Sequence, residues 1–179
     1  TAAGTSVTSG AALDLGGYTL GTAEALTLNG TGVSSGGALM NSGAAATYSG
    51  LITLGSASSI VGGTGTIAVS NAGTITGATF GLTLGGAQGG TLTSILGTTS
   101  GTLTKSGTGT WTVSGASTYT GLTTISAGIL KLGAAGGATN TPLGTTAAGT
   151  SVTSGAALDL GDEFVGGVGV GHVTAPRRG

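Results

Sequence analysis

Side chains that could carry catalytic chemistry are scarce in this sequence. Its 179 residues include four basic and five acidic residues, one histidine and no cysteine. A Ser–His–Asp arrangement would need the single histidine, His172, inside a pocket. Glycoside hydrolysis needs paired carboxylates, but the adjacent Asp162 and Glu163 would point to opposite faces of a strand. We therefore predict that the chain is not an enzyme and carries no catalytic residue, cofactor or metal.

The chemistry available for binding is equally restricted. A net charge of −1 with four basic residues cannot form a track for phosphates, so we expect no nucleic-acid partner. Calcium-binding nonapeptide solenoids place an Asp in every glycine-rich turn, and the turns here carry none. No helix follows the glycine-rich run from Gly85 to Gly90 to hold an anion, so we interpret that run as a turn. Asn29, Asn41 and Asn71 stand near glycines at strand ends, which predicts turn caps or short amide ladders.

A long internal repeat organises the chain. The first sixteen residues, TAAGTSVTSGAALDLG, recur without change at 146–161. The offset is 145 residues (146 − 1), so residues 1–145 form one complete period and 146–161 begin the next. Asp14 and Asp159 are therefore one position in successive copies, not a catalytic pair. Such a copy indicates a tandem array, which is typical of extended structural or binding proteins.

The composition predicts short strands joined by tight turns. Charged residues make up 5% of the chain against about 25% in an ordinary soluble domain, and aromatic residues only 3%. The 41 glycines are best placed at turns, where a positive φ suits them. No window of ten or more residues shows helical apolar spacing, so we predict an all-β protein without significant helix. Alternating apolar and small polar residues indicate strands at 12–15, 26–29, 51–54, 66–70, 74–76, 82–84, 102–104, 110–114, 123–126, 129–132 and 157–160.

Among all-β architectures the sequence favours a β-solenoid. A sandwich of this length needs several large aromatic core residues, and a membrane barrel needs strands of about nine to eleven residues. A solenoid needs only short strands, tight turns, a thin aliphatic core and ladders of Thr, Ser or Asn. With about 20 residues per coil we expect about nine rungs, a rod of roughly 40 Å and about 35 Å per period. Lys105 and Lys131, roughly one coil apart, are either neighbours on one face or two independent solvated lysines.

Residues 101–132 read GTLTKSGTGTWTVSGASTYTGLTTISAGILKL. This stretch resembles the autotransporter-associated β-strand repeat of Gram-negative passenger domains, whose pattern is GxLxKxGxGxLxLxGxNxYTGxTxIxxGxLxL. Two positions depart from it, because Trp111 replaces an aliphatic residue and Ser117 an asparagine. The pattern is followed at Gly101, Leu103, Lys105, Gly107, Gly109, Val113, Gly115, Tyr119, Thr120, Gly121, Thr123, Ile125, Gly128 and Leu130, and Leu132 continues it.

The resemblance implies a right-handed parallel β-helix that is exported across the outer membrane to the cell surface or the medium. On that basis we expect a non-catalytic structural repeat that acts as a stalk, adhesin or filament-forming rod in adhesion, aggregation or biofilm. The alternative is a scaffold within a passenger whose enzymatic or binding domain lies outside this chain. The expected partners are further copies of the chain, associating end to end or laterally, or host and cell surfaces. A self-assembling amyloid-like fibre of separate chains is a third interpretation.

After Gly161 the sequence leaves the repeat. The continuation would be GYTLGTAEALTL, as at 17–28, but the chain reads DEFVGGVGVGHVTAPRRG. We interpret 1–161 as the solenoid segment and 162–179 as an atypical tail, which is a cap, a junction or an artificial end. The sequence shows no signal peptide and no apolar stretch of about 18 residues, so we expect no membrane insertion of this segment.

Overall fold

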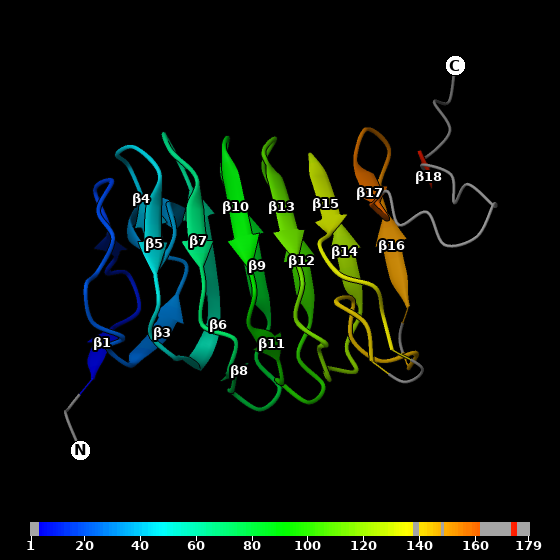
Figure 1. Cartoon of the computed structure of the whole chain (residues 1–179), viewed down its shortest axis with the longest axis horizontal. Coiled ribbons are helices and arrows are strands. Elements are labelled where there is room, and N and C mark those ends of the chain that lie inside the picture. The colour runs from blue at the N-terminus through cyan, green and yellow to red at the C-terminus, as the bar shows by residue number, and fades with distance from the viewer. Residues whose placement is uncertain (1–3, 138–139, 148, 162–172, 175–179) are drawn as a thin grey trace.

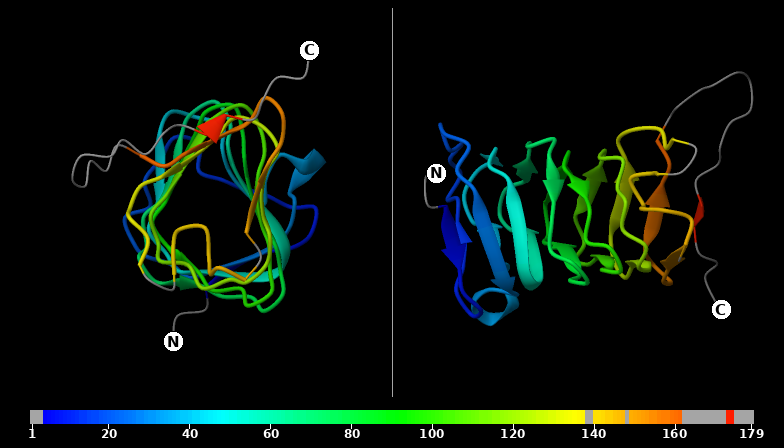
Figure 2. Two further views of the ribbon diagram at one scale, coloured as in Figure 1. Left: turned by 90° about the vertical axis from the view of Figure 1, so that its right-hand side faces the viewer. Right: turned by 90° about the horizontal axis from the view of Figure 1, so that it is seen from below.

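The chain winds into a continuous parallel coil, as shown by the computed structural model (Figure 1). The structure describes residues 4–137, 140–147, 149–161 and 173–174. Successive turns stack along one long axis, and the view along that axis shows them following a common closed outline (Figure 2). The predicted all-β solenoid is confirmed. Within the described ranges the helical content is one 3₁₀ turn, η1 (Val33–Ser35).

Three sheets run along the coil. The first contains β1 (Thr5–Val7), β2 (Leu13–Asp14), β3 (Leu26–Gly30), β4 (Leu39–Asn41), β6 (Ile52–Gly62), β9 (Leu82–Gly85), β12 (Leu103–Lys105), β14 (Thr123–Ile125) and β16 (Thr150–Val152). The second contains β5 (Ala46–Tyr48), β7 (Ile67–Val69), β10 (Gly89–Leu92), β13 (Thr110–Val113), β15 (Ile129–Leu132), β17 (Ala157–Asp159) and β18 (Val173–Thr174). The third pairs β8 (Thr74–Ile75) with β11 (Ile95–Leu96).

Strand order follows the winding of the chain. The first sheet runs β1-β3-β6-β9-β12-β14-β16, with β2 joined to β4 and β4 to β6. The second runs β18-β17-β15-β13-β10-β7-β5. All strand pairings described are parallel, except that β17 and β18 are antiparallel. In the first two sheets, each strand between the ends of these orders therefore pairs with the strand one turn before it and the strand one turn after it.

The core consists of like side chains stacked in register between turns. In the first sheet one inward column is Leu39, Ile60, Leu84, Lys105, Ile125 and Val152. In the second sheet an inward column is Tyr48, Val69, Leu92, Val113 and Leu132. A column of hydroxyls between the inward positions is Ser59, Thr83, Thr104, Thr124 and Ser151. These columns are the thin aliphatic core and the Ser/Thr ladders expected of a solenoid.

The coil has about six turns instead of the nine expected. The length of chain between paired residues varies, since it is short from Trp111 to its partner Leu130 and much longer from Ile129 to its partner Ala157. Most turns are longer than the coil assumed from the sequence, because loops of unequal length join the strands, including the loop from β3 to β4 that carries η1. Six spacings of about 4.8 Å make one period roughly 29 Å long, which is shorter than expected.

The two copies of the repeated sequence have the same local structure. In each, a Thr-Ser-Val strand leads into a turn, and an aspartate then accepts a hydrogen bond from the glycine two residues later. The matching hydrogen bonds are Ala11 N to Thr8 O (3.0 Å) and Ala156 N to Thr153 O (3.1 Å), then Gly16 N to Asp14 Oδ1 (3.0 Å) and Gly161 N to Asp159 Oδ1 (2.9 Å). From the Thr-Ser-Val strand to the aspartate turn the repeat therefore encodes one backbone conformation, whereas the preceding glycines differ, since Gly149 has a positive φ of 78° and Gly4 does not.

Each strand segment predicted from alternation overlaps a strand of the structure. Alternation did not reveal β1, β4, β5, β10, β11, β16 and β18, which are short or rich in glycine. The interpretation of the run from Gly85 to Gly90 as a turn is wrong at both ends, because Gly85 is the last residue of β9. Gly89 and Gly90 begin β10 and pair with Thr110 and Trp111, because the flanking strands supply backbone partners that outweigh glycine's low strand preference.

Candidate functional site

The repeat-like segment 101–132 forms two stacked corners of the coil (Figure 1). It contains β12 and β13, which lie in the first and second sheets, and then β14 and β15, one turn further along the same sheets. Leu103 therefore pairs with Thr123, and Trp111 with Leu130. The segment stacks on itself, so its motif residues can be examined as one site.

Lys105 is buried inside the coil. Its side chain is 0% exposed and lies in register between Leu84 and Ile125. Burial lowers the pKa of Lys105 to about 8. Its Nζ donates hydrogen bonds to three backbone carbonyls: Ser106 O (2.9 Å), Gly107 O (2.8 Å) and Ala127 O (2.9 Å). The ammonium group thus joins the corner after β12 to the corner after β14, one turn away.

The two lysines are independent, but only Lys131 is solvated. Lys131 lies in β15 on the second sheet with its side chain 42% exposed, and its Nζ is 3.7 Å from Asp159 Oδ2. Sequence reasoning missed the burial of Lys105, although the signal was present. Leu103 and Lys105 are two residues apart in one strand, so both must point to the same face as the core.

The two departures from the family pattern are both accommodated by hydrogen bonds. Trp111 is 0% exposed, and its Nε1–H donates to Gly85 O over 2.9 Å. A buried indole needs such an acceptor, so the substitution leaves no donor without a partner. Ser117 is 4% exposed, and its Oγ accepts from Leu96 N (3.1 Å) and donates to Gly115 O (3.3 Å).

A buried hydroxyl pair lies beside β14. Tyr119 Oη and Thr123 Oγ1 are 2.6 Å apart, and both side chains are buried. Burial raises the pKa of Tyr119 to about 12, although the hydrogen bond to Thr123 acts in the opposite direction. The phenol therefore stays protonated at neutral pH and packs as a polar core group.

Two glycines of the motif form a stacked corner. Gly107 and Gly128 have φ values of 72° and 64°, which residues with a side chain rarely adopt. A Cβ on Gly107 would lie 2.6 Å from Gly86 O, and one on Gly128 would lie 2.5 Å from Gly107 O. Backbone packs directly on backbone at this corner, which is also where Lys105 finds its acceptors.

The remaining motif residues have packing roles. Leu103, Val113, Ile125 and Leu130 are buried, and Leu132 is half-buried. Thr120 is exposed, and its Oγ1 donates to Thr99 O over 3.1 Å. At the other motif glycines a Cβ would come within 3.0 Å of the backbone of the preceding turn: Gly101, Gly109, Gly115 and Gly121.

Comparison with known families identifies this segment. The family model described as passenger-associated-transport-repeat matches residues 103–132. Residues 103–132 are therefore similar to a passenger-associated-transport repeat. The resemblance to the autotransporter passenger repeat is thereby confirmed for β12 to β15. No curated protein and no solved structure matches the chain.

Asparagines cap turns outside the passenger repeat. Asn41 is 0% exposed; its Oδ1 accepts from Gly17 N (2.8 Å), and its Nδ2 donates to Thr66 O (2.9 Å). One amide therefore links three successive turns. Asn29 Nδ2 donates to Val7 O (3.0 Å) and Asn71 Nδ2 to Ser49 O (2.9 Å). Turn capping, one of the two arrangements predicted for the asparagines, is confirmed for Asn41 and Asn71, whose Oδ1 atoms accept from Gly43 N (3.2 Å) and Gly73 N (2.8 Å).

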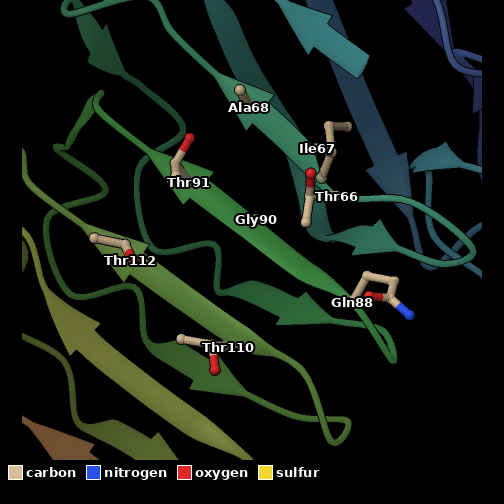
Figure 3. A pocket seen from close by; sticks show the side chains of 8 residues that line it. All are labelled: Thr66, Ile67, Ala68, Gln88, Gly90, Thr91, Thr110 and Thr112. Atoms are coloured by element: carbon tan, nitrogen blue, oxygen red, sulfur yellow. The ribbon is translucent and has the colours of Figure 1, made fainter. Parts of the chain in front are cut away.

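A shallow depression of about 290 Å³ lies on the outer face of the second sheet (Figure 3). The lining offers hydroxyls and one amide but no charge: Thr66, Ile67, Ala68, Gln88, Gly90, Thr91, Thr110 and Thr112. It lacks the enclosed apolar space of a typical small-molecule site.

The acidic residues that the structure describes do not gather around a common centre. The described ranges contain no group of three or more His, Cys, Asp or Glu residues that could hold a metal. Asp14 accepts hydrogen bonds from Ser42 and Gly16, which lower its pKa below the usual value. His172, Asp162 and Glu163 lie outside the described residues. Among the described helices none is both long and apolar enough to cross a membrane.

Proposed function

We propose that this chain is a structural rod of an autotransporter passenger, displayed outside the cell, which extends adhesive or aggregating surfaces away from it. The observation that carries the proposal is the passenger-associated repeat at 103–132, built into an otherwise continuous parallel coil. The repeat family and the solenoid together suggest a structural role rather than a catalytic one. They fit a passenger scaffold.

The pairing between turns of the coil supports a role as a rod that holds binding surfaces away from the cell. Each turn pairs with its neighbours through backbone hydrogen bonds, so further periods lengthen the rod without requiring a new core. The outward Ser/Thr columns present regularly spaced hydroxyls that can hydrogen-bond to glycans or to another flat surface. The scarcity of charge keeps like charges from stacking at the rung spacing.

The test is display of the chain on a non-adherent Gram-negative host, fused to a heterologous translocator. We expect faster cell settling and stronger attachment to abiotic surfaces than with an empty translocator, at equal surface exposure to added protease. Thr91→Asp, on the outer face of the second sheet, should reduce attachment without changing surface exposure. Attachment no greater than with the empty translocator would exclude the adhesive role.

The alternative is a passive scaffold for an enzymatic or binding domain outside this chain. It is supported by the same passenger repeat and would require no adhesive surface. In that case the displayed chain stays non-adherent, and a reporter domain fused before residue 1 becomes accessible to antibodies as the number of periods increases.

A further inference from the structure

The repeated sixteen-residue sequence pairs through opposite edges in its two copies. In the first copy β1 pairs with the following turn, with Thr5 opposite Leu26. In the second copy β16 pairs with the preceding turn, with Thr150 opposite Thr123. The second strand of the repeat behaves alike, because β2 pairs with β4 whereas β17 pairs with β15. Taken together, the two copies show how the two strands of the repeat pair with the preceding turn and with the following turn.

These two sets of contacts are compatible in a single strand. The turn and Asx hydrogen bonds are the same in both copies, so the backbone from the strand to the aspartate turn need not change; only Gly4 would have to adopt the positive φ of Gly149. The middle residue points outward in both: Ser6 is the partner of Thr27, and Ser151 is the partner of Thr124. A single Thr-Ser-Val strand can therefore pair with β14 through one edge, as β16 does, and with β3 through the other edge, as β1 does.

We propose that a second copy of this chain joins end to end by strand exchange. Residues 1–16 of one molecule replace residues 146–161 of the other against β14 and β15, while they keep their own pairing with β3 and β4. The junction then reproduces the register of a continuous tandem array. The proposal concerns assembly alone and holds whether or not the rod is adhesive.

The balance of contacts favours exchange. In two separate molecules each copy at the junction pairs with its own coil through one edge, and β17 also pairs with β18. In the joined form one copy pairs with a coil through both edges, and the other copy is released. The number of parallel pairings is conserved, and the released segment regains conformational freedom. The costs are the lost freedom of association and the antiparallel pairing of β17 with β18.

The copy to be replaced is lightly held. Val152 and Leu158 are half-buried, whereas their register partners Ile125 and Leu130 are 0% exposed. The terminal strands therefore contribute less apolar burial than the strands on which they lie.

Cysteine pairs provide the test, because the chain has no cysteine of its own. Ser6 and Thr124 belong to strands five pairings apart in the first sheet, too far for a disulfide within one molecule. Exchange makes them register neighbours. Ser6→Cys/Thr124→Cys should give, under mild oxidation, a ladder of disulfide-linked dimers and multimers.

Two control variants distinguish strand exchange from nonspecific disulfide formation. Ser6→Cys/Thr104→Cys has similarly placed cysteines, but Thr104 already has neighbours on both edges, so we expect at least tenfold less linkage. Thr124→Cys/Ser151→Cys should close within one molecule and abolish assembly. Equal linkage by both Ser6 variants, or assembly that survives the closed disulfide, would overturn the proposal.

A second measurement needs no substitution. Sedimentation of the unmodified 179-residue chain should show concentration-dependent lengthening that an excess of the peptide TAAGTSVTSGAALDLG suppresses. A strict monomer at millimolar concentration, or lengthening that the peptide does not affect, would contradict strand exchange.

Discussion

At the residue scale, the buried lysine of the passenger repeat connects two turns. An aliphatic residue at position 105 would continue the column formed by Leu84 and Ile125. Lysine instead places three N–H donors against three carbonyls of stacked corners. The side chain thus combines an apolar stem in the core with a polar end that satisfies the backbone.

Replacing Lys105 with methionine tests this role. Lys105→Met keeps most of the length of the stem but leaves three carbonyls without their donor, so we expect a loss of about 1–3 kcal/mol of unfolding free energy. Urea unfolding followed by circular dichroism measures it. The control Lys131→Met removes an exposed lysine and should change stability by less than about 1 kcal/mol. Equal effects of the two variants would show that the three hydrogen bonds contribute nothing specific.

Lys105 also predicts how stability depends on pH. Its pKa is lowered in the fold to about 8, so between about pH 8 and 10 the unfolded chain binds more protons and stability should rise with pH. The rise should be about 2 kcal/mol, and it should be absent in Lys105→Met. Above about pH 10 stability should fall again, because burial raises the pKa of Tyr48 and Tyr119 to about 12 and the unfolded tyrosines ionise first. Constant stability from pH 8 to 10 would mean that the carbonyls offset the burial of the ammonium group.

At the scale of elements, short strands are held in register by their corners. Most strands are only a few residues long and supply few hydrogen bonds each, so the stacking of corners must prevent slippage of one turn over the next. Gly86, Gly107 and Gly128 occupy the same corner on successive turns with positive φ. Asn41 has a comparable effect elsewhere by bonding to the turns on both sides of it.

Gly107→Ala should disrupt the stacked corner. The added Cβ meets Gly86 O at 2.6 Å, in a left-handed conformation that costs alanine energy even without a clash. We expect a loss of about 2 kcal/mol or more in thermal or urea unfolding. Gly21→Ala is the matched control, because a Cβ there meets nothing within 4 Å, and its effect should stay within about 0.5 kcal/mol. A tolerated Gly107→Ala would mean that the corners can shift independently.

At the scale of the whole molecule, one sequence period is longer than six turns of the coil, because Val152 stacks in the column of Leu13 and not in that of Val7. The order β1-β3-β6-β9-β12-β14-β16 begins and ends on the same Thr-Ser-Val sequence after six pairings. The long strand β6 makes this possible, because its first part pairs with β3 and its last part with β9. A tandem array can therefore continue without a break in hydrogen bonding.

A chain lengthened by one period tests this geometry. Inserting a second copy of 17–161 after Gly161 adds 145 residues (161 − 16) and should lengthen the rod by about 29 Å at an unchanged cross-section. Small-angle X-ray scattering measures both quantities. A markedly larger increase in length, or a thicker particle, would show that the added period does not stack in the same coil.

The sequence by itself determined the fold class, most strands, the passenger repeat and the 145-residue period, because alternation, glycine placement and exact repetition are local or periodic signals. The tertiary structure decided what depends on contacts between turns. It set the number of turns, since loop lengths and not strand patterns fix the residues in each coil. It paired the glycine-rich β10, and it placed the charge of Lys105 inside the core, where carbonyls of two different turns converge. The identical residues 5–7 and 150–152 illustrate this difference most clearly. Both segments form a strand, but the position of each strand in the coil decides through which edge it pairs.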